Sequence, residues 1–265
     1  MTFWIFIYLI VAGIFGGLLA SIAGLASLVS YPACSLIDIP PVVANVTNTA
    51  GLVLSGVGAT ISSSRELRGE SKLVTDLTAI TLAGGILGSI MLLIEPVSTF
   101  EHIVPFFILS AGILLLLSGH QANRNTIPPL HEQNKLGLFL KVIGLFLVGA
   151  YTGYFGAAGG VIVLAILTFS LPQRFTVLNA FKNVMVFMAN AVATVIYAVR
   201  GKIDWLVVIP LGVGFLIGGY CAPLLCAMCQ SSCYEPALHL QHLRWHALAA
   251  DLFVQAYFLP NKNIN

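Results

Sequence analysis

The sequence predicts an all-α integral membrane protein of about seven to eight transmembrane helices, arranged as two parallel four-helix repeats with broken helices. Three observations carry this prediction. The chain of 265 residues is 58% hydrophobic and only 8% charged, whereas globular domains carry about 25% charged residues. Apolar runs of about 20 residues, long enough to cross a bilayer as helices, recur along it. Glycine-rich stretches interrupt two of these runs at corresponding places in the two halves, which is typical of a transporter's binding site.

The glycine-rich stretch of the second half runs from Gly149 to Asn183 and reads GAYTGYFGAAGGVIVLAILTFSLPQRFTVLNAFKN. Five glycines fall within its first twelve residues, and each costs a helix about 1 kcal/mol relative to alanine. At membrane depth, irregular backbone is tolerated only where it is buried in protein or lines a cavity. We therefore predict a helix broken beside a pocket, with Gly156, Gly159 and Gly160 at the break.

A similar stretch near the N-terminus runs from Gly13 to Thr49 and reads GIFGGLLASIAGLASLVSYPACSLIDIPPVVANVTNT. Gly24 falls where Gly160 falls in the later stretch, and the segment Asn-Val-Thr-Asn-Thr lines up with Asn-Ala-Phe-Lys-Asn, 134 residues later. Together the two stretches predict a substrate-binding site made of Gly24, Asn45, Thr47, Asn48, Thr49, Gly156, Gly159, Gly160, Asn179, Lys182 and Asn183.

The apolar runs place the expected spans along the chain. They lie at residues 3–29 (broken near Gly24), 42–62, 73–94, 103–118, 136–169 (broken by the later glycines), 175–199 and 205–225, with a weaker eighth run at 238–259. We expect a first transmembrane repeat at 1–120, a cytoplasmic linker at 121–135 and a second repeat at 136–265. From about residue 226 the second repeat is atypical: residues 226–246 are rich in cysteine, histidine and glutamine. A shifted reading frame and a peripheral segment are alternative explanations.

Basic residues predict the orientation of the spans, because lysine and arginine concentrate in cytoplasmic loops. Eight of the twelve basic residues lie in the connections that follow the second, fourth, sixth and eighth expected spans. This pattern predicts that both termini are cytoplasmic in a multi-pass protein of the cell (plasma or inner) membrane. Four spans in each half would make both halves enter from the same side, which is why the repeats are expected to be parallel.

Lys182 is the residue most indicative of a substrate. A charged residue inside a span usually faces a cavity or a partner, and no carboxylate lies near Lys182 in the sequence. The half-helix that starts at Gly159 and Gly160 would also point its amide N–H groups into the break, where they favour an anion. Two alternatives remain: Lys182 extends to the membrane surface, or the glycines serve only close helix packing.

Other functional classes lack their signatures. A nucleophile–base pair, a P-loop lysine and a basic run are all absent, so we expect neither an enzyme nor nucleic-acid binding, and no cofactor or metal. One CxxC motif, Cys226 to Cys229, is a weak signal by itself. Neither repeat motif holds an acidic residue or a histidine at mid-span. Coupling would then use the ionisation of the substrate, a cation at carbonyl ends, or the anion gradient.

With its two glycine-rich breaks, each followed by a helix with an Asn/Thr/Lys cluster, the chain resembles the TauE/SafE family of sulfite exporters from about residue 10 to 225. The segment Arg-Gly-Lys-Ile-Asp-Trp at 200–205 is similar to the family's loop before the next span. The first repeat is the poorer copy, since Ala20 and Ala23 stand where Gly156 and Gly159 stand later. The resemblance implies transport of small sulfur-containing or carboxylate anions across the cell membrane.

The function expected from these observations is a secondary transporter of small sulfur-containing or organic anions, with export as its direction. Its partners would be a sulfite, sulfonate or carboxylate anion and the lipid bilayer, and a homo-oligomer is left open. A passive anion channel and a membrane assembly subunit without transport activity are the alternatives.

Overall fold

The computed structural model describes residues 3–37, 39–96, 135–156, 159–200 and 203–229, which are helical apart from short connections. The helices are α1 (Phe3–Ala23), α2 (Ser27–Ser35), α3 (Pro41–Ser62), α4 (Ser71–Ile94), α6 (Lys135–Tyr154), α7 (Gly159–Ser170), α8 (Phe175–Val199) and α9 (Trp205–Cys229). Six of them (α1, α3, α4, α6, α8 and α9) are long and apolar enough to cross a membrane. The predicted all-α membrane fold is therefore confirmed, and the chain is a multi-pass membrane protein.

The ends of the helices follow local sequence signals. α3 begins at a proline pair, Pro40 and Pro41. Proline has no amide hydrogen, and this costs nothing here because the first amide groups of a helix have no intrahelical partner. Proline after Glu95 prevents α4 from continuing. The expected spans at 103–118 and 238–259, the linker up to residue 134 and the segment from residue 230 lie outside the described residues.

The two breaks are built alike and confirm the predicted interruption of two helices. Between α1 and α2, Gly24 has a φ of 75°, and between α6 and α7, Gly156 has a φ of 76°, a left-handed conformation that glycine adopts without strain. The structural counterpart of Gly24 is therefore Gly156, and the sequence alignment of Gly24 with Gly160 was wrong by four residues. On the corrected alignment, the counterpart of Ala20 is Thr152.

Each break turns the chain back, so that α1–α2 and α6–α7 are helical hairpins. Ser27, at the start of α2, is bonded to Asn48 in the middle of α3. Cys34, near the end of α2, lies close enough to Tyr8 at the start of α1 for electrostatic interaction. The α1–α2 hairpin thus returns toward the end of the bundle at which it began, which the sequence prediction had counted as one crossing.

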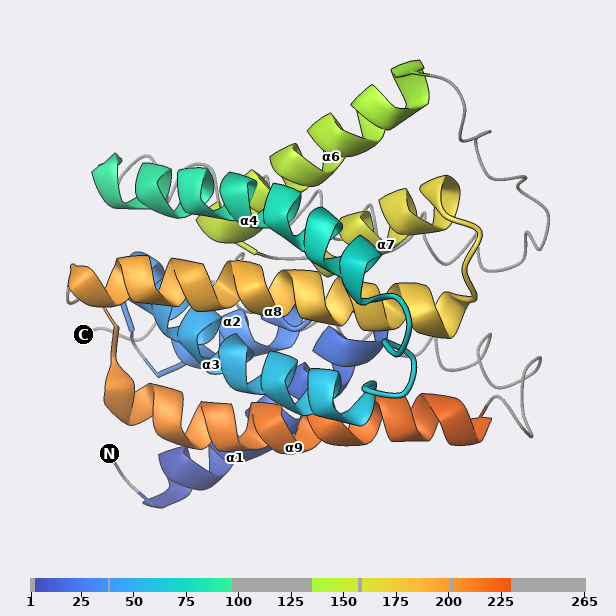
Figure 1. Ribbon diagram of the computed structural model, residues 1–265. Helices are drawn as coiled ribbons and strands as arrows, with labels where there is room; N and C mark the ends of the chain where they lie inside the picture. The colour runs from blue at the N-terminus through green and yellow to red at the C-terminus, as the bar shows by residue number, and fades with distance from the viewer. Residues whose placement is uncertain (1–2, 38, 97–134, 157–158, 201–202, 230–265) are drawn as a thin grey trace.

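The two halves of the protein are inverted relative to each other (Figure 1). Close contacts between α1 and α9 and between α3 and α9 rise together in residue number, so these three helices run in the same direction. Beyond the end of α8, the amide N–H of Asp204 donates to Thr47 Oγ1 near the start of α3 at 3.1 Å, so α8 runs antiparallel to α3. The expected parallel relation of the repeats is wrong, because α3 and α8, which follow the hairpins of the two halves, run in opposite directions.

The last described helix of each half packs against the opposite half. α4 contacts α6 and α8, whereas α9 contacts α1 and α3. Glycines allow these close approaches: a Cβ on Gly84 would lie 2.0 Å from the Phe146 carbonyl oxygen, and one on Gly149 would lie 2.1 Å from that of Thr81. The glycines of α4 therefore serve packing. The boundaries at residues 120 and 135 stay a prediction.

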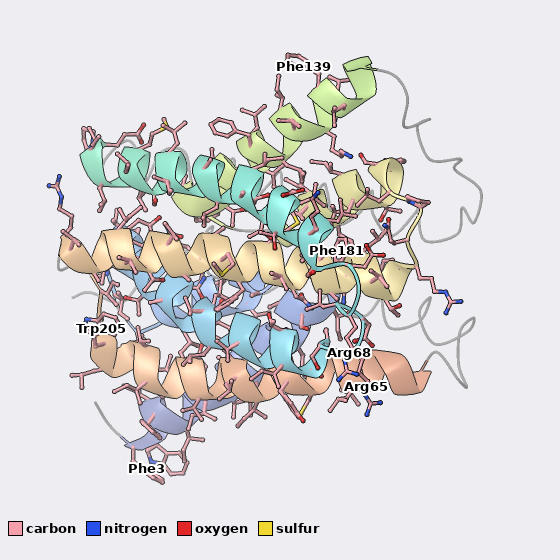
Figure 2. All side chains as sticks on the ribbon, viewed as in Figure 1. Phe3, Arg65, Arg68, Phe139, Phe181 and Trp205 are labelled. Atoms are coloured by element: carbon pink, nitrogen blue, oxygen red, sulfur yellow. The ribbon has the colours of Figure 1, made fainter. Side chains whose placement is uncertain are left out.

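The charged loops lie at opposite ends of the bundle, contrary to the expected orientation. Figure 2 shows Phe3 and Trp205 at one end and Arg65 and Arg68 at the other. The connections 63–70 and 200–204 were both expected to be cytoplasmic. However, the first follows the end of α3, whereas Asp204, at the end of the second, contacts Thr47 near the start of α3. The N-terminus and the connection 63–70 therefore cannot both face the cytoplasm.

Candidate functional site

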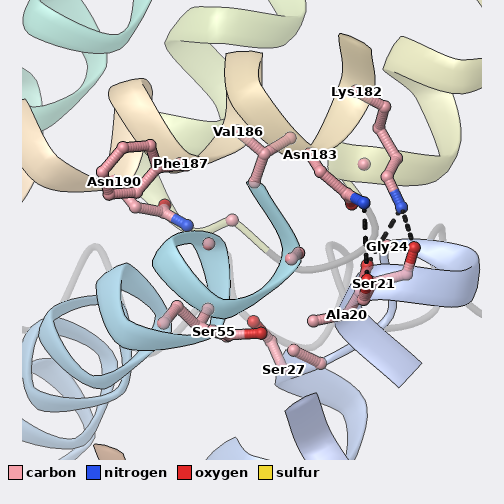
Figure 3. Close-up of a pocket in the computed structure, with 16 residues that line it drawn as sticks. Ala20, Ser21, Gly24, Ser27, Ser55, Lys182, Asn183, Val186, Phe187 and Asn190 are labelled. Atoms are coloured by element: carbon pink, nitrogen blue, oxygen red, sulfur yellow. Dashed lines mark hydrogen bonds between the residues drawn. The ribbon is translucent and has the colours of Figure 1, made fainter. Parts of the chain in front are cut away.

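A pocket lies where the two breaks cross, between α3 and α8 (Figure 3). The cavity has a volume of about 40 Å³, and one water needs about 10–15 Å³ of such space. The pocket therefore holds about three waters or one small ion. It is lined by Ala20, Ser21, Gly24, Ala26, Ser27, Leu52, Ser55, Gly56, Ala59, Gly156, Gly160, Lys182, Asn183, Val186, Phe187 and Asn190.

The backbones of the two breaks touch at one wall of this pocket. A Cβ added to Gly24 would lie 2.5 Å from the Cα of Gly160, and a Cβ on Gly160 would lie 2.6 Å from the Cα of Gly24. Both distances are too short for any real side chain, so only glycine allows this crossing. The start of α7 is thereby held against the end of α1.

Lys182 is buried, with 1% of its surface exposed, which excludes the alternative that it extends to the membrane surface. Its ammonium donates to the carbonyl oxygens of Ala20 at 3.1 Å and Ser21 at 2.8 Å (Figure 3). These carbonyls belong to the last turn of α1, where the helix dipole is negative and favours a cation. Lys182 therefore holds the end of α1 and lines the pocket at the same time.

Two asparagines hold the ends of the hairpins in equivalent ways. Asn179 Nδ2 of α8 donates to the carbonyl oxygen of Ser21 at 3.1 Å, and Asn45 Nδ2 of α3 donates to that of Tyr154 at 3.0 Å. In each case a helix of one half satisfies a carbonyl that the break leaves without an intrahelical partner. Neither asparagine lines the pocket.

The structure therefore divides the predicted site residues into two groups. Gly24, Gly156, Gly160, Lys182 and Asn183 line the pocket. The remaining six do not line it: Asn45 and Asn179 hold helix ends, Asn48 donates to Ser27 Oγ, Thr49 Oγ1 donates within α3 to Asn45, Thr47 accepts from Asp204, and Gly159 packs against Thr152.

Polar pocket residues that sequence reasoning left out of the site are Ser21, Ser27, Ser55 and Asn190. Asn183 Nδ2 donates to Ser21 Oγ at 3.4 Å, so Ser21 connects the end of α1 to α8. Ser27 could have been found from the sequence, because it follows Gly24 at the start of the half-helix after the break. Ser55 and Asn190 carry no such signal, since their place depends on how α3 and α8 cross.

The pocket is electropositive. Lys182 is among its lining residues, which include no aspartate, glutamate or histidine. In the described part of the chain, no three histidine, cysteine, aspartate or glutamate side chains come together as a metal site would require. Amides and hydroxyls supply the other polar groups, so the site can accept one negative charge and several hydrogen bonds.

Residues beside the second break make polar and aromatic contacts with neighbouring helices. Tyr154 OH donates to Glu95 Oε2 at 2.6 Å, and Tyr197 OH donates to the carbonyl oxygen of Gly153. The rings of Tyr31 and Phe155 meet edge to face at 5.6 Å. The pocket residues of α3 lie in its second half, nearer the connection 63–70.

Comparison with known proteins relates the chain to membrane transporters. The chain is 26% identical over 221 residues to "Probable membrane transporter protein ORF9" of Sinorhizobium sp., covering 82% of each chain. It is 27% identical over 217 residues to a "Probable membrane transporter protein" of Haemophilus influenzae, covering 78% of this chain and 79% of that one. No solved structure matches. The family model described as sulfite exporter TauE/SafE matches residues 9–235. The protein is thus a membrane transporter, and it belongs to the sulfite exporter TauE/SafE family.

Proposed function

We propose that the protein is a secondary transporter that exports small sulfur-containing or organic anions across the cell membrane. The observation that carries this proposal is the ammonium of Lys182 in a pocket whose lining holds no carboxylate. The pocket lies at the crossing of two broken helices in an inverted repeat, which is where such transporters bind their substrates.

The size of the pocket supports a small substrate. A cavity of about 40 Å³ suits an anion of a few heavy atoms, such as hydrogen sulfite or a short carboxylate. One lysine in a neutral pocket suits a monoanion. Amide groups of Asn183 and Asn190 and the hydroxyls of three serines are available for its oxygens.

The distribution of basic residues supports export. Arg65, Arg68, Lys72 and Arg174 lie at the end of the bundle where α3 ends, while Arg200 lies at the other end, and basic residues favour the cytoplasm. The pocket lies nearer the end with more basic residues, so it would load from the cytoplasm. This orientation places the N-terminus outside, in place of the cytoplasmic N-terminus that the sequence suggested.

Counterflow in proteoliposomes tests the proposal. Vesicles loaded with unlabelled sulfite, sulfate, thiosulfate, sulfoacetate, formate or acetate are diluted into a trace of the labelled anion. We expect saturable accumulation of the label with sulfite and the short carboxylates, because a carrier exchanges its substrate across the membrane. Anion current that does not saturate would indicate a channel, and no flux with any anion would indicate an assembly subunit.

A further inference from the structure

Pairs of residues with equivalent contacts or conformations in the two halves define which positions correspond. Asn45 and Asn179 each donate to the last turn of the opposite hairpin, so α3 and α8 correspond at a separation of 134 residues. Gly24 and Gly156 are the two left-handed glycines, so the breaks correspond at a separation of 132 residues.

On this correspondence, the contact of Lys182 with Ala20 has a counterpart that is chemically different. Asn48 stands in the place of Lys182, and Thr152 stands in the place of Ala20. The asparagine side chain is neutral, and it is two bonds shorter than that of lysine. The end of α1 therefore receives an ammonium group from α8, whereas the end of α6 receives none from α3 at the equivalent position.

Both residues of the counterpart carry buried oxygen atoms without a partner. Asn48 is 1% exposed and Thr152 is 2% exposed, and neither Asn48 Oδ1 nor Thr152 Oγ1 has a hydrogen-bond partner in the described structure. The amide N–H of Gly156 donates to the carbonyl oxygen of Tyr151 at 3.2 Å instead of that of Thr152, so among the described residues this amide leaves the Thr152 carbonyl available. Buried polar atoms without partners are rare in native proteins, and an ion or a water that bonds to them is one explanation.

The charge around these oxygens favours a cation. The last turn of α6 carries the negative end of its helix dipole, and the donors that the structure shows there, the Asn45 amide and the Tyr197 hydroxyl, are neutral. At the equivalent place on α1, the fold already accommodates the positive charge of Lys182.

We propose that a sodium ion binds at the end of α6, in the place that the Lys182 ammonium takes at the end of α1. Its protein ligands are Asn48 Oδ1, Thr152 Oγ1 and the carbonyl oxygen of Thr152. The role of this ion in driving anion transport rests on the function proposed above, whereas its binding does not.

The ligand chemistry favours a monovalent metal cation, and the occurrence of sodium at half-helix ends makes sodium the first choice. Neutral amide, hydroxyl and carbonyl oxygens suit a hard cation, and carbonyls at half-helix ends bind sodium in other transporters. A divalent ion is disfavoured because no carboxylate belongs to the set. A proton is disfavoured because neither an amide nor a threonine hydroxyl titrates near neutral pH.

Thermal unfolding of the purified protein in detergent, with no anionic substrate added, tests the site directly. We expect the Tm to rise by a few degrees in NaCl relative to choline chloride or KCl at equal ionic strength, because an ion that binds the native state stabilises it. Thr152→Val and Asn48→Leu should raise the half-saturating sodium concentration at least about tenfold. Thr78→Val is the control, because Thr78 is a buried threonine whose hydroxyl is bonded within α4.

Asn48→Lys is the sharpest variant, since it gives α3 the ammonium that α8 already has. We expect its Tm to be independent of sodium and close to that of the sodium-bound parent. An equal response to NaCl and choline chloride in the parent, or an unchanged sodium response in Thr152→Val, would overturn the site. Equal stabilisation by KCl would overturn the choice of sodium.

Counterflow with and without sodium then tests whether the bound sodium is coupled to anion transport, separately from whether it binds. We expect the affinity for the anion to rise with sodium in the parent protein and to be insensitive to sodium in Asn48→Lys. Sodium binding with no effect on anion flux would overturn the coupling role. Sodium binding with no anion flux under any condition would contradict the transport function and leave the cation site intact.

Discussion

The ammonium group of Lys182 has two negative partners, one present in the structure and one proposed. It donates to the carbonyls of Ala20 and Ser21, and it lines the pocket in which the anion would bind. An anion near Lys182 competes with these carbonyls for the ammonium. Binding would therefore loosen the end of α1, so on this proposal Lys182 would both recognise the substrate and control the hairpin.

We expect Lys182→Gln to weaken anion binding and to lower stability together. Loss of charged hydrogen bonds to buried carbonyls costs about 1.5–3 kcal/mol each, and loss of the charge should raise the half-saturating anion concentration at least about tenfold. Counterflow at equal membrane abundance and thermal unfolding measure the two effects. Lys141→Gln, on the partly exposed side of α6, is the control. A lower Tm with unchanged anion affinity would leave Lys182 with a structural role alone.

At the residue scale, the sequence predicted some of the residues that line the pocket but not the contacts that hold the helix ends. Lys182 was predictable because a charge inside a span is costly, and Gly24 because glycines concentrate where a helix breaks. The bonds from Asn45 and Asn179 to the ends of the opposite hairpins were not predictable. They join residues more than 100 positions apart, and asparagine next to a break fits a ligand as well as a helix end.

At the scale of elements, the two hairpins are held together by backbone contact at their breaks. Gly24 and Gly160 approach so closely that a Cβ on either one would lie within 2.6 Å of the Cα of the other. The left-handed φ of Gly24 adds a second restriction at the same point. A substitution there changes the distance between the hairpins as well as the local backbone.

We expect Gly160→Ala to lower the Tm and to abolish counterflow, because the added methyl group collides with the backbone of Gly24 and separates the hairpins. Overpacking of this kind costs about 1–3 kcal/mol. Gly137→Ala is the matched control: it lies in α6 with no atom within 4 Å of the added Cβ, and it should stabilise slightly through helix propensity. Unfolding and counterflow of both variants are the measurement. Full activity of Gly160→Ala would show that the crossing tolerates a wider separation.

At the scale of the whole molecule, the last described helix of each inverted half packs against the other half. α4 packs on the hairpin of the second half and α9 on that of the first. A motion of one hairpin would therefore act directly on a helix of the other half. Such an arrangement supports two states of similar energy in which the pocket opens to one end or the other.

The spans of the described helices were predictable from hydropathy, but their directions were not. Apolar length gave α3, α4 and α8 to within two residues at each end, and α9 to within four. Hydropathy does not distinguish a broken helix that continues across the membrane from one that turns back, because both are equally apolar. Counting each broken segment as one crossing reversed the second half and placed the connections 63–70 and 200–204 on one side.

Labelling of single cysteines in a cysteine-free background distinguishes the inverted arrangement from the parallel one. Ser64 and Pro172 follow α3 and precede α8 at the same end of the bundle, whereas Leu36 lies at the other end. All three side chains are exposed. We expect Ser64→Cys and Pro172→Cys to be protected from an impermeant reagent added outside intact cells, and Leu36→Cys to react, because the basic residues place the first end in the cytoplasm. Opposite accessibility of Ser64→Cys and Pro172→Cys would contradict the inverted fold, while reaction of both with protection of Leu36→Cys would reverse only the orientation in the membrane.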